Sequence, residues 1–428
     1  MIKKNKKKLI FIQLNEINFE LLKNYSNKYN FKFFNSQFLE KLVNTKSENE
    51  YSLLEPWIQW VSIYTGLEAK KHKIFRLGDG ENSNHIHFYN LIEEKGYSIG
   101  AISPMNFKNN LKNSLYFIPD PWSQSDPDSN LFSKLITSTI RKFVNENSSK
   151  EKTFKDYFKL MFIFLINFRF KNIKLLFKLI FNISNHWNKA LLFEYLLNNL
   201  HLNNIEKYRP DFTSIFFNSG AHIQHHYYFN SIFLNKIKNP SWYIDKKHDP
   251  IFDMLKFYDE IIFEYQKNKD YDLVIATGLR QIPYDRIKYY YRLKNHNEFL
   301  KKISVKFKGI VPKMSRDFIV FFDDKESTNK AEKIFNQINE LNSMKIFYTD
   351  KRNNSIFVTL TINDQISDKY EIMVNKDNKI NLNNYVNFIA IKNGMHDQKG
   401  YFYSNCEHLN LKNNEHVKNI HNVINDYF

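Results

Sequence analysis

Residues 212–228, FTSIFFNSGAHIQHHYY, constrain the fold of this chain more than any other stretch. The apolar run at 212–217 predicts a buried strand, and the small polar residues after it predict that the strand ends there. Three histidines come next, at His222, His225 and His226. Ligands of an open α/β sheet bind beyond the carboxyl ends of its strands. We therefore expect a functional site at the end of this strand.

The spacing of the three histidines fits one side of a helix. Helical residues three and four positions apart are neighbours, and two histidines four apart on a helix can share a metal ion. The alternative gives each histidine a separate structural role, with one in the core, one capping a helix and one in solvent. The sequence leaves both interpretations open.

Composition limits the classes of partner. The chain has 428 residues and a formal net charge of +17, which predicts attraction to anionic partners. Its many Phe, Tyr, Asn and Lys residues also fit an AT-rich coding sequence, which weakens a functional interpretation of that charge. We find no recognised nucleic-acid motif, so phosphorylated substrates, glycan substrates and anionic membrane surfaces are the candidates. Cys406 is the single cysteine, which excludes an intramolecular disulfide.

The beginning of the chain resembles a signal peptide in part. A basic arm precedes an apolar run at 9–14, but that run is short and no small-residue cleavage site follows it. No stretch reaches the length of a membrane span. We expect a cytoplasmic protein, and the sequence leaves open a peripheral position at the inner membrane face.

Further apolar runs at 98–103 and 272–276 predict strands, and segments of helical period lie between them. Repeated strand–helix–strand order is typical of a parallel sheet. The sequence therefore predicts an α/β fold with a doubly wound, mainly parallel sheet. We expect helices at 17–25, 57–65, 82–96 and 251–265, and a late core strand at 385–391.

Changes in pattern predict two insertions in this core. Residues 131–208 form a helical insertion in which the apolar, lysine-rich stretch 154–181 is either a cap over an active site or a membrane-facing surface. Residues 300–375 predict a small α+β insertion. The resulting division is 1–130, 209–299 and 376–428 for the α/β core, with the two insertions between these parts.

Polar residues follow the predicted strand ends, at Asn15-Glu16, at the histidine cluster, at 277–281 and at His396, and Glu55 opens a helix. Three segments of this layout resemble the phosphodiesterase and nucleotide pyrophosphatase branch of the alkaline phosphatase superfamily. WVSIYTGLEAKKHKI at 60–74 is similar to a segment with a Thr-Gly pair before His-Gly-Ile. AHIQHHYY at 221–228 is similar to an Asp-x-x-x-His motif followed by an aromatic residue, and His396 with Gly400 is similar to the late metal histidine and its glycine.

The resemblance implies a sheet of the alkaline phosphatase type, two metal ions that are usually zinc, and a Thr or Ser nucleophile. Two of the implied metal ligands are kept, as His225 and His396. The other implied positions fall on residues without the expected side chain: Asn15 for the first Asp, Glu55 or Pro56 for the nucleophile, Ala221 for the second Asp, and Thr277-Gly278 for an Asp-His pair. A standard two-zinc site is therefore not supported.

The preferred hypothesis is a rebuilt active site in a hydrolase or transferase that acts on a phosphate-bearing substrate, such as a nucleotide-sugar or surface-glycan precursor. Its candidate catalytic residues are Glu16, Glu55, His222, His225, His226 and His396. A single divalent metal could be held by His225, His396 and Glu16, and the metal itself stays unknown at this point. Substrate contacts are expected from Asn15, Thr277, Arg280 and Gln281.

Two alternatives stay open. The fold could serve a binding or scaffold protein that has lost catalysis, since the implied nucleophile is absent. The chain could also be a membrane-associated component of glycan assembly, with the basic aromatic helices as its docking element. The sequence does not settle the oligomeric state.

Overall fold

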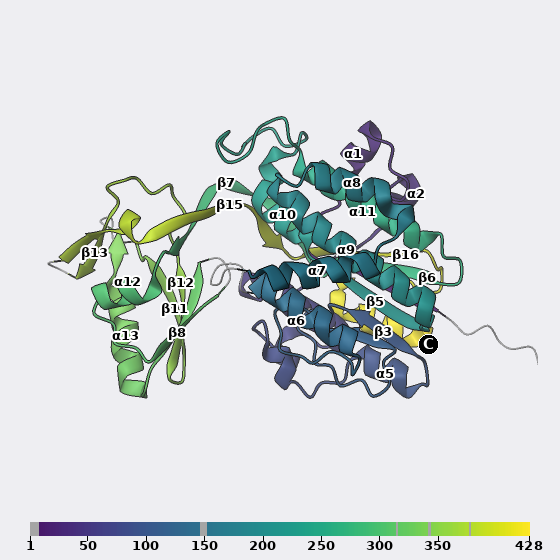
Figure 1. Cartoon of the computed structure of the whole chain (residues 1–428), viewed down its shortest axis with the longest axis horizontal. Helices are drawn as coiled ribbons and strands as arrows, with labels where there is room; N and C mark the ends of the chain where they lie inside the picture. Colours follow the sequence, from purple (N-terminus) through teal and green to yellow (C-terminus); the bar gives the residue numbers. More distant parts are fainter. Residues whose placement is uncertain (1–7, 146–151, 314–315, 341–343, 376–377) are drawn as a thin grey trace, which may run out of the picture. The chain divides into compact units, whose positions relative to one another are not determined.

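A computed structural model describes residues 8–145, 152–313, 316–340, 344–375 and 378–428 (Figure 1). The chain forms two compact units. Unit 1 comprises Met1–Lys238, Asp245–Pro283 and Gly394–Phe428, and unit 2 comprises Asn239–Ile244 and Tyr284–Asn393. The division into five segments predicted from the sequence stays a prediction.

Unit 1 contains an eight-stranded sheet with the order β17-β2-β16-β6-β1-β5-β3-β4. Its centre is parallel: β1 (Leu9–Leu14) lies between β5 (Phe212–Phe217) and β6 (Asp272–Ala276), and β3 (Ile99–Ile102) joins β5 to β4 (Tyr116–Ile118). The remaining strands lie at the other edge, where β16 (Lys399–Ser404) pairs antiparallel with β6 and with β2 (Val43–Lys46), which in turn pairs with β17 (Glu415–His416). The prediction of a doubly wound, mainly parallel sheet is confirmed.

Helices cover both faces of this sheet because its central strands are apolar on both faces. Every residue of β1 and β5 is buried. One face packs against α3 (Pro56–Thr65), α5 (Phe88–Glu94) and α14 (Ile420–Tyr427). The other face carries α9 (His186–Tyr208), α10 (Ser219–Tyr227) and α11 (Pro250–Gln266), and Figure 1 turns this face to the viewer.

Local signals determine where several of these helices begin and end. Asp249 caps α11 because its side chain accepts a hydrogen bond from the backbone N–H of Phe252, and Pro250 fits the first turn. Gly66 ends α3 in a left-handed conformation with φ of 71°. These two ends agree with the sequence prediction.

The segment after β4 is helical as predicted. It forms α6 (Leu131–Asn145), α7 (Phe154–Ile166) and α8 (Ile173–Phe181), and it continues into α9. Among the described residues, every helix is too short or too polar to span a bilayer.

Three sequence predictions of secondary structure are corrected. The helix expected at 17–25 is α1 (Leu22–Lys28), and the one expected at 82–96 is shortened to α5. The strand expected at 385–391 is real but does not enter the core sheet. It is the start of β15 (Val386–Asp397), which pairs with β7 (Arg280–Leu293) in a separate two-stranded sheet. Three of its first four residues are exposed, so the apolar residues at the start of this strand do not form part of a core.

Unit 2 has its own hydrophobic core, separate from that of unit 1. A four-stranded antiparallel sheet has the order β11-β12-β9-β8, and a three-stranded sheet has the order β10-β13-β14. Helices α12 (His296–Lys302) and α13 (Lys325–Gln337) belong to this unit. The strands are β8 (Gly309–Pro312), β9 (Asp317–Phe321), β10 (Asn339–Glu340), β11 (Phe347–Arg352), β12 (Ser355–Leu360), β13 (Glu371–Asn375) and β14 (Asn378–Asn381).

Candidate functional site

Glu16 is the centre of the site, and its backbone is held in an unusual conformation. It follows β1 with φ of 60°, in the left-handed region that non-glycine residues seldom occupy. Its N–H donates to Thr277 O at 3.2 Å, and its carbonyl accepts from Gln281 N at 3.1 Å. The side chain of Gln224 also donates to that carbonyl, at 2.9 Å. Strained residues of this kind cluster at functional sites because the surrounding structure must hold them in place.

The Glu16 carboxylate is almost fully buried, at 2% exposure, and is surrounded by hydrogen-bonding groups. Its Oε2 lies 3.1 Å from Nε2 of His225 and 3.0 Å from Nε2 of His396. Oε2 also accepts from Nε2 of Gln281, and Oε1 accepts from Nδ2 of Asn15 at 3.1 Å. Burial raises the pKa of Glu16, but the charges of His396 and His225 and their hydrogen bonds outweigh it, so the pKa lies well below its ordinary value. Glu16 is therefore an ionised ligand at neutral pH.

The two histidines lie on two different elements, a helix and a strand outside the eight-stranded sheet. His225 lies on α10, directly after β5, and its Nδ1 lies 3.1 Å from the carbonyl oxygen of Gly394. His396 lies near the end of β15, with Nδ1 3.5 Å from Oε2 of Glu55. Each imidazole thus faces Glu16 with Nε2 and a second acceptor with Nδ1. Such a second contact fixes the tautomer of a metal-binding histidine.

The donor set fits a divalent metal ion. The carbonyl of Gly394 can only accept, so Nδ1 of His225 carries a proton and Nε2 is left facing a carboxylate. That approach is repulsive unless a second proton or a cation lies between the two atoms. The same reasoning applies to His396, which faces a carboxylate from each ring nitrogen. Either two imidazolium protons or one divalent cation would balance the two carboxylates.

Glu16, His225 and His396 each offer one ligand atom, and these atoms lie within 4.8 Å of one another. Among the described residues this is the one cluster of three or more such side chains. Two histidines and one carboxylate are a known donor set for catalytic zinc and for non-haem iron. The sequence hypothesis of a single-metal site at these residues is compatible with this geometry, whereas the other ligand positions implied by the resemblance carry Asn15, Ala221 and Thr277-Gly278.

Asn15 positions Glu16 and is itself fully occupied. Its Nδ2 donates to Glu16 Oε1 and, at 2.7 Å, to Oδ1 of Asn218. Its Oδ1 accepts from the indole N–H of Trp60 at 2.8 Å. Asn218 precedes α10, and its backbone N–H donates to the buried carboxylate of Glu194 on α9. A network of buried polar groups therefore joins Glu16 to the helix that carries His225.

Thr277, Arg280 and the amide nitrogen of Gln281 lie close to the site and contact protein groups, whereas Oε1 of Gln281 has no hydrogen-bond partner among the described residues. Thr277 and Gln281 are fully buried, and Thr277 Oγ1 accepts from Tyr401 N at 2.9 Å. The guanidinium of Arg280 pairs with Glu20 and, through Nε at 2.6 Å, with Asp397. These residues and Asn15 support the ligands as the structure stands, and their contact with a substrate stays a prediction.

His222 and His226 do not join the cluster. Their rings lie 4.8 Å apart, and His222 is exposed. The metal candidate is therefore not a pair of histidines four positions apart on one helix. His225 instead lies beside His396, which is distant in sequence. Glu55, the residue directly before α3, does reach the site. Its side chain is 34% exposed and contacts His396.

Two contributors could not be found from the sequence. Gln224 lies next to His225 and holds Glu16 through its amide, and Glu194 lies in a helix with no other sign of function. The only local signal for Gln224 is a polar residue between histidines. Glu194 gives a weaker one, a carboxylate in an otherwise apolar stretch of helix.

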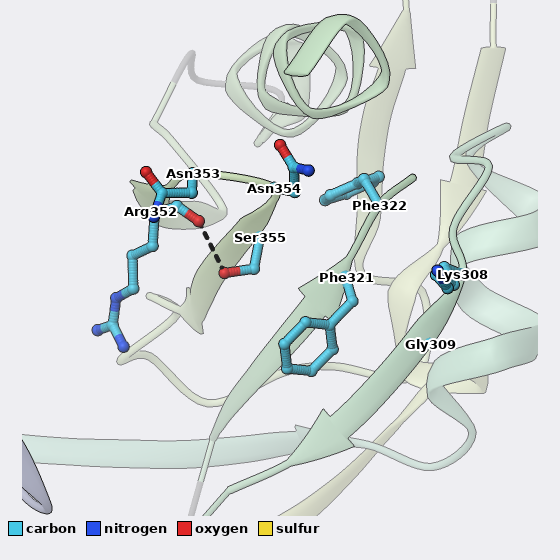
Figure 2. A pocket seen from close by; sticks show the side chains of 8 residues that line it. All are labelled: Lys308, Gly309, Phe321, Phe322, Arg352, Asn353, Asn354 and Ser355. Carbon is cyan, nitrogen blue, oxygen red and sulfur yellow. Dashed lines mark hydrogen bonds between the residues drawn. The ribbon is translucent and has the colours of Figure 1, made fainter. Parts of the chain in front are cut away.

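Unit 2 contains an open hollow of about 590 Å³ lined by two cations and several polar groups (Figure 2). Lys308 pairs there with Asp323 at 3.5 Å, and Arg352 pairs with Asp350 at 2.9 Å. Because acids already neutralise both cations, this hollow offers less for an anionic substrate than the cluster around Glu16.

No protein-family model matches the chain, and no curated protein sequence matches it. Several solved structures are similar. Phosphonoacetate hydrolase from Sinorhizobium meliloti, solved with phosphonoacetate, is 9% identical with a TM-score of 0.46, over 99% of this chain and 96% of that chain. Murine ectonucleotide pyrophosphatase/phosphodiesterase 5 is 9% identical with a TM-score of 0.46, over 98% and 94%. The alkaline phosphatase PafA is 10% identical with a TM-score of 0.44, over 98% and 95%.

Proposed function

We propose that this chain is a hydrolase or transferase that uses one divalent metal ion to act on a phosphate-bearing substrate. The observation that supports it most is the convergence of Glu16, His225 and His396 at the carboxyl ends of the strands, with ligand atoms within 4.8 Å of one another. The motif resemblance gives the reaction class. The net charge of +17 fits an anionic substrate.

In this proposal Glu16, His225 and His396 hold the ion, which would act as a Lewis acid toward a phosphoryl oxygen. Glu55 takes the place where the superfamily has its nucleophile. Its carboxylate is partly exposed and can remove a proton from an attacking water or hydroxyl group, as general bases do. His396 can orient Glu55, because its Nδ1 lies 3.5 Å from Oε2 of Glu55. Asn15, Gln224 and Gln281 keep Glu16 in place.

The finer substrate within this proposal is a nucleotide-sugar or a surface-glycan precursor, and it follows from the motif resemblance alone. The competing function is a binding protein without turnover. It is favoured by one observation, the replacement of the implied nucleophile by Glu55 and Pro56.

Metal analysis and hydrolysis of aryl phosphate mono- and diesters test the proposal together. We expect about one zinc or similar ion per purified chain, because the cluster holds one set of ligands. Glu16→Gln and His396→Ala should lose both the ion and turnover. Glu55→Gln should keep the ion and lose turnover by about 10²- to 10⁴-fold, as expected for a general base.

His222→Ala is the matched control, because that histidine lies on α10 but outside the cluster. It should keep both metal and turnover. A chain that binds one ion and hydrolyses none of these esters would support the binding protein, and a chain that binds none would refute the metal site itself.

A further inference from the structure

Among the described residues of unit 1, exposed large apolar side chains are concentrated on α7 and α8. On α7 the exposed apolar side chains follow the helical period from Phe154 to Ile166. They therefore form a single stripe on one side of the helix. Phe154 is 87% exposed and Leu165 is 62% exposed. The opposite side of α7 carries the buried Ile163. An amphipathic helix of a globular protein normally buries such a stripe.

Helix α8 repeats this arrangement. Leu175, Leu176 and Leu179 are buried on the side that packs towards α9, whereas Phe177 and Phe181 are 49% and 81% exposed. Both helices belong to the face of unit 1 that Figure 1 turns to the viewer. Exposed apolar patches of this size mark a surface that binds something.

The charges around the two stripes indicate what they bind. The exposed cations are Lys155 and Lys159 on α7, with Lys171, Lys174 and Lys178 at or near α8. Between residues 152 and 193 the sole acidic residue is Asp156, which is buried and pairs with Lys142 at 2.8 Å. Among the described residues, α7 and α8 themselves carry no exposed acid, and apolar stripes edged by lysines in this way match a bilayer that carries anionic headgroups.

A second copy of the chain fits this surface less well. A two-fold interface would bring together two copies of the same lysine-rich surface, and like charges in contact disfavour association. A spanning helix is not needed for membrane binding, since amphipathic helices lie in the interface with their apolar side in the acyl region.

We propose that α7 and α8 form a docking surface for an anionic lipid bilayer. The exposed aromatic and aliphatic side chains enter the interface, and the lysines contact the headgroups. This proposal does not depend on the metal site, because it uses none of the residues that form that site.

Flotation of the full chain with lipid vesicles tests the proposal. We expect binding to phosphatidylglycerol–phosphatidylcholine vesicles, weak binding to phosphatidylcholine alone, and a loss of binding at about 0.5 M salt, which screens surface charges. Lys155→Glu, Lys159→Glu and Lys174→Glu together should weaken binding by roughly a hundredfold or more, since each lysine near such a surface favours binding. The control variant changes the net charge by the same amount at three exposed lysines elsewhere, with Lys23→Glu, Lys28→Glu and Lys41→Glu. It should bind the anionic vesicles far more tightly than the variant on α7 and α8 does.

A second pair of variants separates apolar insertion from charge attraction. Phe154→Ser, Phe158→Ser and Leu165→Ser together should abolish flotation. Tyr51→Ser, Ile86→Ser and Ile232→Ser remove exposed apolar side chains elsewhere in unit 1 and should float as the parent does. All these side chains are exposed, so circular dichroism and metal content should stay unchanged.

Three results would overturn the proposal. The first is no flotation with anionic vesicles at low salt. The second is flotation that the two control sets reduce as much as the docking-surface sets do. The third is a concentration-dependent dimer in sedimentation, broken by the α7 substitutions in a chain that does not float, which would assign the surface to a second copy.

Discussion

Oε2 of Glu16 lies 3.0 Å from Nε2 of His396, although 380 positions of sequence separate the two residues. The contact exists because the last residues of β15, a strand outside the eight-stranded sheet, lie against the residue that follows β1. Four predictions follow from the groups that keep these two side chains together.

Replacing Asn15 by Leu should loosen the metal site. The change leaves Glu16 Oε1, Asn218 Oδ1 and the indole N–H of Trp60 without their present partner. We expect a loss of unfolding free energy of about 1–3 kcal/mol and a fall in metal affinity of roughly 10- to 100-fold. Chemical denaturation and isothermal titration with zinc measure the two effects.

Trp60→Phe is the comparison for this variant, because it removes a single one of the three contacts. It should affect metal affinity less than Asn15→Leu does. Equal metal affinity in the parent chain and Asn15→Leu would show that Asn15 does not position Glu16.

Gly394→Ala should disturb the site from the side of His225. A Cβ at this position would lie 2.1 Å from Oε1 of Gln281 and 2.9 Å from the carbonyl of Gln224, so the backbone that accepts from His225 must shift. Overpacking of this kind costs about 1–3 kcal/mol of stability. Metal affinity, measured by competition with a chelator, should fall in parallel.

Gly309→Ala serves as the control because nothing lies within 4 Å of the added carbon. Its unfolding free energy and its metal affinity should match those of the parent chain. If Gly394→Ala behaves in the same way, the packing described around Gln281 is wrong.

The unfolding free energy should depend on pH through the buried carboxyl group of Glu194. Burial raises the pKa of Glu194 to about 7, against hydrogen bonds from Ser219, Tyr258 and Asn218 that lower it. A carboxyl whose folded pKa is raised stabilises the fold below its unfolded pKa, and this contribution is lost as the pH rises through the folded pKa. Between about pH 5 and pH 8 the unfolding free energy should therefore fall, by about 3 kcal/mol at most.

Glu194→Gln should remove this decline in denaturant titrations at several pH values. Glu206→Gln is the matched control on the same helix. The pKa of Glu206 is lowered by its hydrogen bond to Arg169, so it stays ionised across this range. A slope unchanged in Glu194→Gln would assign the decline to other groups.

Variants of Arg280 can show whether this side chain supports the site or binds the substrate. Arg280→Met removes the pairing with Glu20 and Asp397, and it leaves a partly buried Asp397 beside His396. We expect a loss of about 3 kcal/mol, as for other broken buried ion pairs. Arg280→Lys should recover part of it, because lysine keeps the charge and loses the forked geometry.

Thermal unfolding and steady-state kinetics distinguish the two roles of Arg280. A supporting role lowers the melting temperature and the metal affinity of both variants. A raised KM at unchanged stability would instead show that the guanidinium binds the substrate, as the sequence hypothesis holds.

Local signals allowed much of the fold to be predicted. The apolar runs of β1, β5 and β6, the cap at Asp249 and the stop at Gly66 each depend on a few neighbouring residues. Predictions failed where neighbours were insufficient. The apolar residues of β15 begin a strand outside the core sheet. The prediction failed because an apolar sequence pattern does not specify which strand it pairs with.

The candidate site shows the same limit. The sequence named Glu16, His225 and His396 as candidate metal ligands, the two histidines by motif order, and it also named His222 and His226 as candidate catalytic residues. The fold orients His225 toward Glu16 and leaves His222 in solvent. It also assigns Asn15 and Gln281 to the carboxylate of Glu16, a pairing with no trace in their spacing.

The sequence by itself determined the strand-and-helix order of unit 1 and the types of side chain at its strand ends, because hydrophobic period and capping are properties of short segments. The tertiary structure alone decided which polar groups meet and which apolar stripes stay exposed. Those outcomes depend on packing between segments hundreds of residues apart, and no local pattern records it.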